Sequence, residues 1–173
     1  MKTVLIVEDE KMIRQGIKTM IMRSGVPIET IMECNNGETA LEILKEQEID
    51  VMFTDIRMPK MDGIELVQKM QSLEHIPLTV AISGYDDFAY AVEMLRNGVR
   101  EYILKPIERE KITEILKKLN AEIESRKEKE ENNQKIGYQQ MRHLMLSDEI
   151  SGEEQRTIES PVSYTHLRAH ETS

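Results

Sequence analysis

The sequence has few of the residues that mark several large classes of protein. Its 173 residues include a single cysteine, Cys34, so an intrachain disulfide is excluded. Tryptophan is absent and aromatic residues make up 4% of the chain. Apolar residues make up 39%, below the roughly 45–50% of a typical globular chain, so part of the chain is expected to lie outside a core. No apolar run approaches the roughly 18 residues that a membrane span requires.

The chain also lacks a basic patch. Its net charge is −9, and acidic residues outnumber basic ones in both halves. Because clustered Lys and Arg supply the contacts to nucleic-acid phosphates, we do not expect these residues to bind DNA directly. The first apolar run, residues 4–7, is too short for a signal peptide. The composition therefore predicts a soluble, cytoplasmic protein without a membrane partner.

Short apolar runs alternate with amphipathic segments over the first 107 residues. The runs predict strands over residues 4–7, 28–34, 51–53, 78–82 and 102–104. Apolar residues at helical spacing predict helices over residues 11–24, 40–44, 64–70 and 88–95, and a fifth helix from about residue 107. This alternation is typical of βαβ units, so we predict an α/β fold with a five-stranded, doubly wound parallel sheet.

The fifth predicted helix is unusually long. Residues 112, 116, 119 and 123 form one apolar stripe, which predicts a folded domain over residues 1–123. Residues 124–135 contain no apolar side chain, and apolar residues return from Ile136, so we expect a helical connector over 124–150. The pair Glu122–Arg126 has the i,i+4 spacing that supports an exposed helix. Residues 151–173 are expected to be a disordered tail.

Polar residues follow four of the predicted strands, where ligands bind in open α/β sheets. They are Glu8 and Asp9 after the first strand, Asp55 after the third, Ser83 after the fourth and Lys105 after the fifth. Carboxylate oxygens suit Mg²⁺, and a carboxylate can also form an aspartyl-phosphate. A hydroxyl and an ammonium group suit phosphoryl oxygens. Each residue alone has an ordinary explanation as a cap, turn or surface residue; their joint placement favours phosphoryl chemistry.

Four motifs resemble the response-regulator receiver family of two-component systems. They are Val7-Glu8-Asp9-Glu10, the nine residues from Asp55 to Gly63 (DIRMPKMDG), Ser83-Gly84-Tyr85 and Lys105-Pro106. Their order and spacing match the family over residues 1 to about 120, and the nine-residue segment is highly specific by itself. The resemblance implies a phospho-acceptor that assists its own phosphotransfer and dephosphorylation, and is otherwise not an enzyme.

The resemblance also implies a role for each residue. Asp55 is expected to accept the phosphoryl group from a sensor histidine kinase. Mg²⁺ is expected to be held by Glu8, Asp9, Asp55 and the backbone carbonyl of Arg57. Ser83 and Lys105 would bind the phosphoryl group, and Tyr102 would be an aromatic switch that turns inward when Ser83 moves, although a strand aromatic packed under a helix is the alternative. The family commonly has a cis bond at Lys105-Pro106.

Two residues near the site are open to two interpretations. Arg57 and Tyr85 lie two positions beyond Asp55 and Ser83, where they either overhang the phosphoryl group and tune its hydrolysis or are solvated loop residues. Met58 and Met61 are expected to pack within their loop rather than to act.

The segment from Ser83 to Ala91 is similar to the receivers of YesN-like regulators, which end in an AraC-type DNA-binding domain. The resemblance implies a homodimer when phosphorylated, formed through the face of the fourth helix, fifth strand and fifth helix. DNA would be bound only through an output domain, and too few residues follow Leu146 to form one. The tail from about residue 161 resembles translated adapter sequence, so we expect a truncated reading frame with a non-native end.

Three other functions would each require features of their own. A haloacid-dehalogenase-type phosphohydrolase would need a second Asp two residues after its nucleophile, where this chain has Arg57. A stand-alone receiver acting by protein contacts remains open, although it would not need the connector. A Rossmann-type nucleotide binder would need a G-x-G-x-x-G after the first strand, and none is present.

Overall fold

A computed structural model describes residues 1–84 and 88–151, with side chains through residue 147. In this part of the chain, five parallel strands form one sheet in the order β2-β1-β3-β4-β5. The strands are β1 (Thr3–Val7), β2 (Thr30–Cys34), β3 (Val51–Asp55), β4 (Leu78–Ser83) and β5 (Glu101–Leu104). The predicted doubly wound α/β fold is therefore confirmed.

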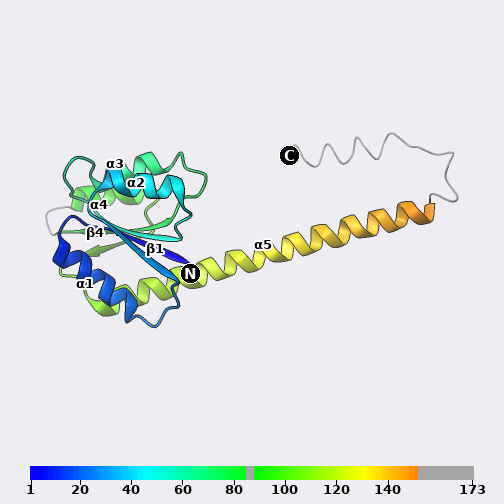
Figure 1. The fold of residues 1–173 in the computed structure, drawn as a ribbon, viewed down its shortest axis with the longest axis horizontal. Helices are drawn as coiled ribbons and strands as arrows, with labels where there is room; N and C mark the ends of the chain where they lie inside the picture. The colour runs from blue at the N-terminus through cyan, green and yellow to red at the C-terminus, as the bar shows by residue number, and fades with distance from the viewer. Residues whose placement is uncertain (85–87, 152–173) are drawn as a thin grey trace. The chain divides into compact units, whose positions relative to one another are not determined.

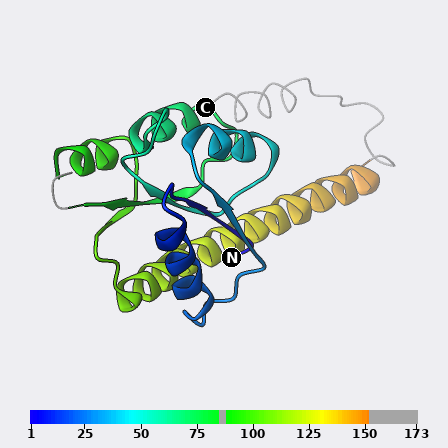
Figure 2. The same cartoon turned by 60° about the vertical axis from the view of Figure 1, so that its left-hand side comes forward.

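Helices cover both faces of the sheet. They are α1 (Lys11–Met22), α2 (Gly37–Glu46), α3 (Gly63–Met70), α4 (Phe88–Arg96) and α5 (Arg109–Ser151). Helices α2, α3 and α4 lie on one face, and α1 and the first part of α5 lie on the other (Figure 1). The same two layers are visible after a turn of 60° (Figure 2).

Several element boundaries differ from those predicted, and three of these differences have a clear local cause. Helix α1 ends at Met22 because the Ser24 hydroxyl donates back to the Ile21 carbonyl (2.7 Å) and Gly25 adopts a φ of +78°. Strand β2 begins at Thr30, after Pro27, which has no N–H for the ladder. Helix α5 begins at Arg109 because its first hydrogen bond runs from the Ile112 N–H to the Glu108 carbonyl (3.2 Å).

Two apolar layers hold the sheet between the helices. Leu5 and Met52 belong to the layer under α2, α3 and α4, whereas Ile6 and Phe53 belong to the layer under α1 and α5. This alternation follows from the two-residue period of a strand. The predicted stripe of α5 is buried in the second layer, with Ile115 beside it. Each such side chain contributes about 1.5–3 kcal/mol by its removal from water.

Residues 1–126 form one compact unit, and the described residues after them, 127–151, belong to a second. Helix α5 runs from the first unit into the second, and from Glu128 to Ser147 its side chains are all exposed. Arg126 donates to Glu122 at 2.9 Å, which confirms that predicted pair. The boundary expected at residue 123 falls within α5, and the tail predictions for residues 152–173 lie outside the described residues. No helix among the described residues is both long and apolar enough to cross a membrane.

Candidate functional site

The register of the sheet brings the predicted site residues to one edge. Val7 pairs with Thr54, so Glu8 and Asp55 follow at the same level of neighbouring strands. Asp55 pairs with Ile82, and Ser83 pairs with Leu104, the residue before Lys105. The chain leaves β1 for β2 on one side and returns as β3 on the other. The acidic residues therefore lie at the switch point of the topology, where such sheets bind ligands.

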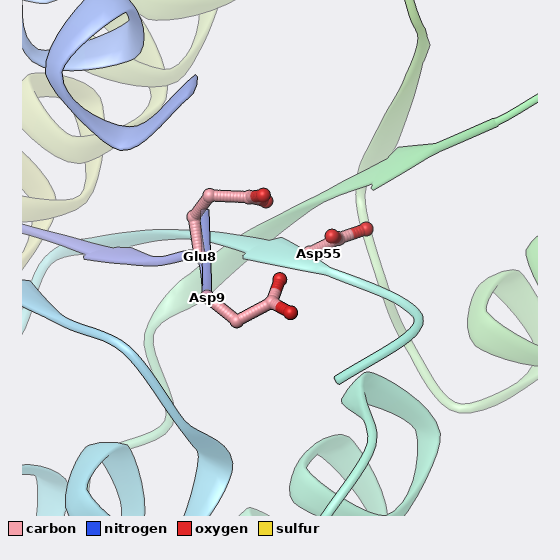
Figure 3. Close-up of side chains that lie close together, drawn as sticks. All are labelled: Glu8, Asp9 and Asp55. Atoms are coloured by element: carbon pink, nitrogen blue, oxygen red, sulfur yellow. The ribbon is translucent and has the colours of Figure 1, made fainter. Parts of the chain in front are cut away.

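Three carboxylates converge at this edge (Figure 3). Glu8 and Asp9, at the end of β1, direct their side chains toward Asp55 at the end of β3. One oxygen from each of the three lies within 4.8 Å of the others. Glu8 is fully buried, Asp55 is 5% exposed, and Asp9 is open to solvent. The cluster thus reaches from the protein interior to the surface.

Asp55 is held by two donors. The backbone N–H of Ile56 donates to its Oδ1 (2.8 Å), and Lys105 Nζ donates to its Oδ2 (3.2 Å). Lys105 Nζ also lies 3.8 Å from Glu8 Oε1. Partial burial lowers the pKa of Lys105, but the Asp55 and Glu8 carboxylates outweigh that effect and the net pKa is raised. Lys105 therefore stays charged beside Asp55.

Glu8 is in an unusual environment for a carboxylate. Burial raises its pKa from 4.5 to about 8, and the negative charge of Asp55 adds to the increase. Neither carboxylate oxygen of Glu8 has a hydrogen-bond partner among the described residues. The hydroxyl of Ser83, also buried, likewise has none. Buried polar atoms are normally satisfied, so unsatisfied oxygens on both sides of Asp55 indicate a site made for a ligand.

Gly63 packs directly against the backbone of Asp55. A Cβ at this position would lie 2.4 Å from the Asp55 carbonyl oxygen, far inside van der Waals contact. The Gly63 N–H donates to the Ile56 carbonyl (2.7 Å), and Asp62 caps α3 through the Glu65 N–H (2.8 Å). The final Asp-Gly of the nine-residue motif therefore closes the loop after β3 onto Asp55.

The remaining predicted residues lie around this centre. Met58 and Met61 are buried against the core, as predicted. Tyr102 is partly buried against the layer under α2, α3 and α4. Lys105-Pro106 is cis, which confirms that expectation. Tyr85 lies outside the described residues.

Two side-chain contacts near the site were not predicted. The Arg14 guanidinium donates to the Glu8 carbonyl (2.8 Å) and lies 3.5 Å from Glu33. The Arg57 guanidinium lies 5.5 Å from the centre of the Tyr90 ring, at the start of α4. A charged residue beside the apolar stripe of the first helix was the only sequence signal for Arg14. The Arg57–Tyr90 contact joins distant loops, so only the fold could reveal it.

Known proteins are similar to this chain in both sequence and fold. Residues 4–117 match the response regulator receiver domain. The chain belongs to the response regulator receiver family. It is a receiver of a two-component system, and such receivers work with sensor histidine kinases and bind Mg²⁺ at an acidic pocket of this kind.

Relatives with this receiver include regulators of transcription. The chain is 31% identical over 123 residues to the uncharacterized transcriptional regulatory protein YesN of Bacillus subtilis, covering 71% of this chain and 33% of that protein. It is 33% identical over 117 residues to the transcriptional regulatory protein HptR of Staphylococcus aureus, covering 67% and 45%. The matched receiver thus spans less than half the length of these relatives.

Solved structures are similar over the same region. The receiver domain of AraT, a response regulator from Geobacillus stearothermophilus, is 34% identical with a TM-score of 0.63, covering 72% of this chain and 97% of that one. A two-component transcriptional regulator AraC from Clostridium phytofermentans is 32% identical with a TM-score of 0.65, covering 75% and 99%. Both cover little more than the receiver unit of this chain.

The oxygen donors of this receiver fit Mg²⁺. Carboxylate oxygens are the hard ligands this ion prefers, and two of the three carboxylates belong to neighbouring residues on one strand end. The unsatisfied oxygens of Glu8 match a partner of positive charge. The thiol of Cys34 is buried in the layer under α2, α3 and α4 and is not part of the carboxylate cluster.

Proposed function

We propose that this receiver accepts a phosphoryl group on Asp55 from a sensor histidine kinase in the cytoplasm. An Asp55 carboxylate oxygen forms the new bond to phosphorus while the bond from phosphorus to the kinase histidine nitrogen breaks, and the histidine leaves as neutral imidazole. The observation that carries the proposal is the position of Asp55. Its carboxylate lies between two further acids and the Lys105 ammonium, at the switch point of the sheet.

The neighbouring residues have separate parts in this proposal. Glu8, Asp9, Asp55 and the backbone carbonyl of Arg57 hold Mg²⁺, which neutralises charge on the phosphoryl oxygens when bound. Lys105 contributes a second positive charge, and the Ser83 hydroxyl donates a hydrogen bond to the phosphoryl group. Both Lys105 and Ser83 must change partners to do so, because Lys105 now contacts Asp55 and Ser83 has no partner among the described residues.

A labelling experiment tests the acceptor. The chain is incubated with acetyl phosphate and Mg²⁺, where the P–O bond breaks and acetate leaves, and its intact mass is measured. We expect one phosphoryl group on the wild type and none on Asp55→Asn or in EDTA. Asp62→Asn is the matched control, because Asn also caps helices well and should leave labelling unchanged. Full labelling of Asp55→Asn, or labelling that persists in EDTA, contradicts the proposal.

The phosphohydrolase alternative finds no support. Its acid/base position is occupied by Arg57, whose side chain is exposed and contacts Tyr90. A guanidinium stays protonated at all working pH values, so it cannot exchange the proton that this reaction needs.

For the output, we propose that phosphorylation leads to pairing through the face of α4, β5 and α5. Strand β5 is one of the two edge strands of the sheet, and Leu95 on α4 and Leu104 on β5 are 43% and 44% exposed. A groove of about 460 Å³ runs along β5, lined by Tyr102, Leu104 and Lys105 among others. Lys105 contacts Asp55 and also lines this groove. A movement of Lys105 toward a phosphoryl group on Asp55 would therefore change the shape of the α4, β5 and α5 face.

We further propose that this receiver belongs to a transcriptional regulator with an AraC-type DNA-binding domain. The names of YesN and HptR support a regulator of transcription, and the name of the Clostridium phytofermentans structure supports the AraC type. DNA would be bound through that output domain and not by the acidic receiver. A receiver that acts alone through protein contacts is the alternative, and a full-length reading frame decides between them.

A further inference from the structure

The second part of α5 has an apolar stripe that no described residue covers. Tyr138, Met141, Leu144 and Met145 are 70%, 61%, 53% and 65% exposed. Their spacing places them on one face of the helix. Scattered apolar residues are normal on a surface, but four large side chains in a contiguous stripe mark a contact site. The preceding turns, from Glu124 to Lys135, contain no apolar residue, so the stripe begins abruptly.

The stripe fits the heptad repeat of a helix pair. With Tyr138 and Met145 at successive a positions, Met141 is at d and Leu144 is at the flanking g. In this frame Glu130 falls at g and Lys135 at e of the next heptad. A parallel pair places g of one helix beside this e of the other, so Glu130 of each copy faces Lys135 of its partner. The same frame leaves Ile136 and Leu146 on the outer face, where pairing does not use them.

We propose that residues 128–147 of α5 pair in parallel with the same residues of a second copy of this chain. The occupant is a second copy because Glu130 at g and Lys135 at e are complementary across a parallel pair of identical helices, whereas an antiparallel pair centred on the stripe does not bring them together. The apolar side chains of the two helices are then removed from water and pack in symmetric layers. Tyr138 of one copy packs against Tyr138 of the other, and Met145 against Met145.

This pairing rests on the proposed dimerisation of the phosphorylated receivers. Two heptads are too short to hold two helices together at micromolar concentrations. Receiver pairing raises the effective concentration of one connector near the other, because each connector belongs to the same chain as its receiver. The paired residues 128–147, called the seam below, would then transmit the phosphorylated state along α5 toward residue 151.

Disulfide trapping tests the seam in the whole chain. Tyr138→Cys and Met145→Cys are made in a Cys34→Ala background and oxidised with Mg²⁺ and beryllofluoride, a phosphoryl mimic. Gln140→Cys is the control, since Gln140 lies on the outer face of the same helix. In a parallel seam, each a position lies within the ~7 Å that a disulfide spans. In an antiparallel pair of the same stripe, Tyr138 faces Met145, and two copies of either residue are about 10 Å apart along the axis.

We expect Tyr138→Cys and Met145→Cys each to form at least about tenfold more covalent dimer than Gln140→Cys. A charge exchange gives a second readout by sedimentation. Glu130→Lys alone and Lys135→Glu alone should each weaken the beryllofluoride dimer about two- to tenfold, and the double variant should restore it.

The outcomes separate this inference from the function on which it rests. If beryllofluoride yields a dimer by sedimentation but the three cysteine variants are trapped equally, receiver pairing stands and the seam is wrong. If only mixed Tyr138→Cys and Met145→Cys chains are trapped together, the pair is antiparallel and the proposal is overturned. If no dimer forms with beryllofluoride, receiver pairing fails and the seam fails with it.

Discussion

At the residue scale, Glu8 has the most perturbed environment in the site. In the Mg²⁺-free protein its pKa is about 8, against 4.5 when it is exposed. Between these values the folded chain keeps a proton that the unfolded chain releases. The free energy of unfolding should therefore fall as pH rises from 4.5 to about 8, because it is costly to ionise Glu8 in its buried position beside the Asp55 carboxylate. Mg²⁺ competes with this proton, so its apparent affinity should rise over the same interval.

Urea unfolding in EDTA at pH 6 and pH 8.5 tests the Glu8 prediction. In Glu8→Gln the unfolding free energy should fall much less between these two pH values than in the wild type, because the amide does not titrate. Glu46→Gln, on the exposed surface of α2, is the matched control and should retain the wild-type decrease. Identical pH dependence in the wild type and Glu8→Gln would show that Glu8 is not the titrating group.

At the element scale, the loop between β3 and α3 depends on Gly63. Because a Cβ would lie 2.4 Å from the Asp55 carbonyl oxygen, Gly63→Ala must displace the backbone of Asp55. We expect a loss of about 1–3 kcal/mol in unfolding free energy from this overpacking. Phosphorylation by acetyl phosphate should slow on the order of tenfold to a hundredfold, because the acceptor is misplaced.

Gly16→Ala is the control for the loop. Gly16 lies in α1, and a Cβ there has nothing within 4 Å. That substitution should stabilise the chain by up to about 1 kcal/mol through helix propensity and leave phosphorylation unchanged. Wild-type labelling rates in Gly63→Ala would mean that the loop tolerates a Cβ and that Asp55 does not depend on the close approach.

At the scale of the whole molecule, the question is how a change at Asp55 leads to pairing. Phosphorylation shifts an equilibrium only through its different contacts with two states, and Lys105 and Ser83 supply that difference. Tyr102, partly buried on β5 beside the groove, is the proposed reporter. Wild type should dimerise with beryllofluoride at tens of micromolar in sedimentation experiments, and Tyr102→Ala should dimerise at least about fivefold more weakly.

Two results bear on this prediction in different ways. A wild type that stays monomeric with beryllofluoride contradicts the pairing face. A Tyr102→Ala variant that dimerises as well as the wild type removes only the switch role, because Tyr102 is not among the residues proposed to bind Mg²⁺ or the phosphoryl group. Phosphorylation of Tyr102→Ala, measured by intact mass, should match the wild type and serves as the internal control.

Sequence patterns were sufficient for the order of the elements and for the residues at the strand ends. The two-residue and 3.6-residue periods report burial locally, so strands such as Val51–Asp55 and the stripe from Ile112 to Ile123 could be recognised one at a time. Asp55, Glu8 and Lys105 could be grouped because parallel strands end on the same edge. Element ends were less accurate, since caps such as Ser24 and Glu108 depend on individual hydrogen bonds.

Only the tertiary structure decided which groups meet and what each meeting does to them. The pKa of Glu8 depends on its complete burial and on Asp55, which comes from another strand. The contacts of Arg14 with the Glu8 carbonyl and of Arg57 with Tyr90 join elements that no local period connects. The sequence by itself therefore determined the fold class and the chemical types at the site. The depth, charge and unsatisfied oxygens of that site arise from long-range packing, because burial and dielectric are properties of the assembled molecule.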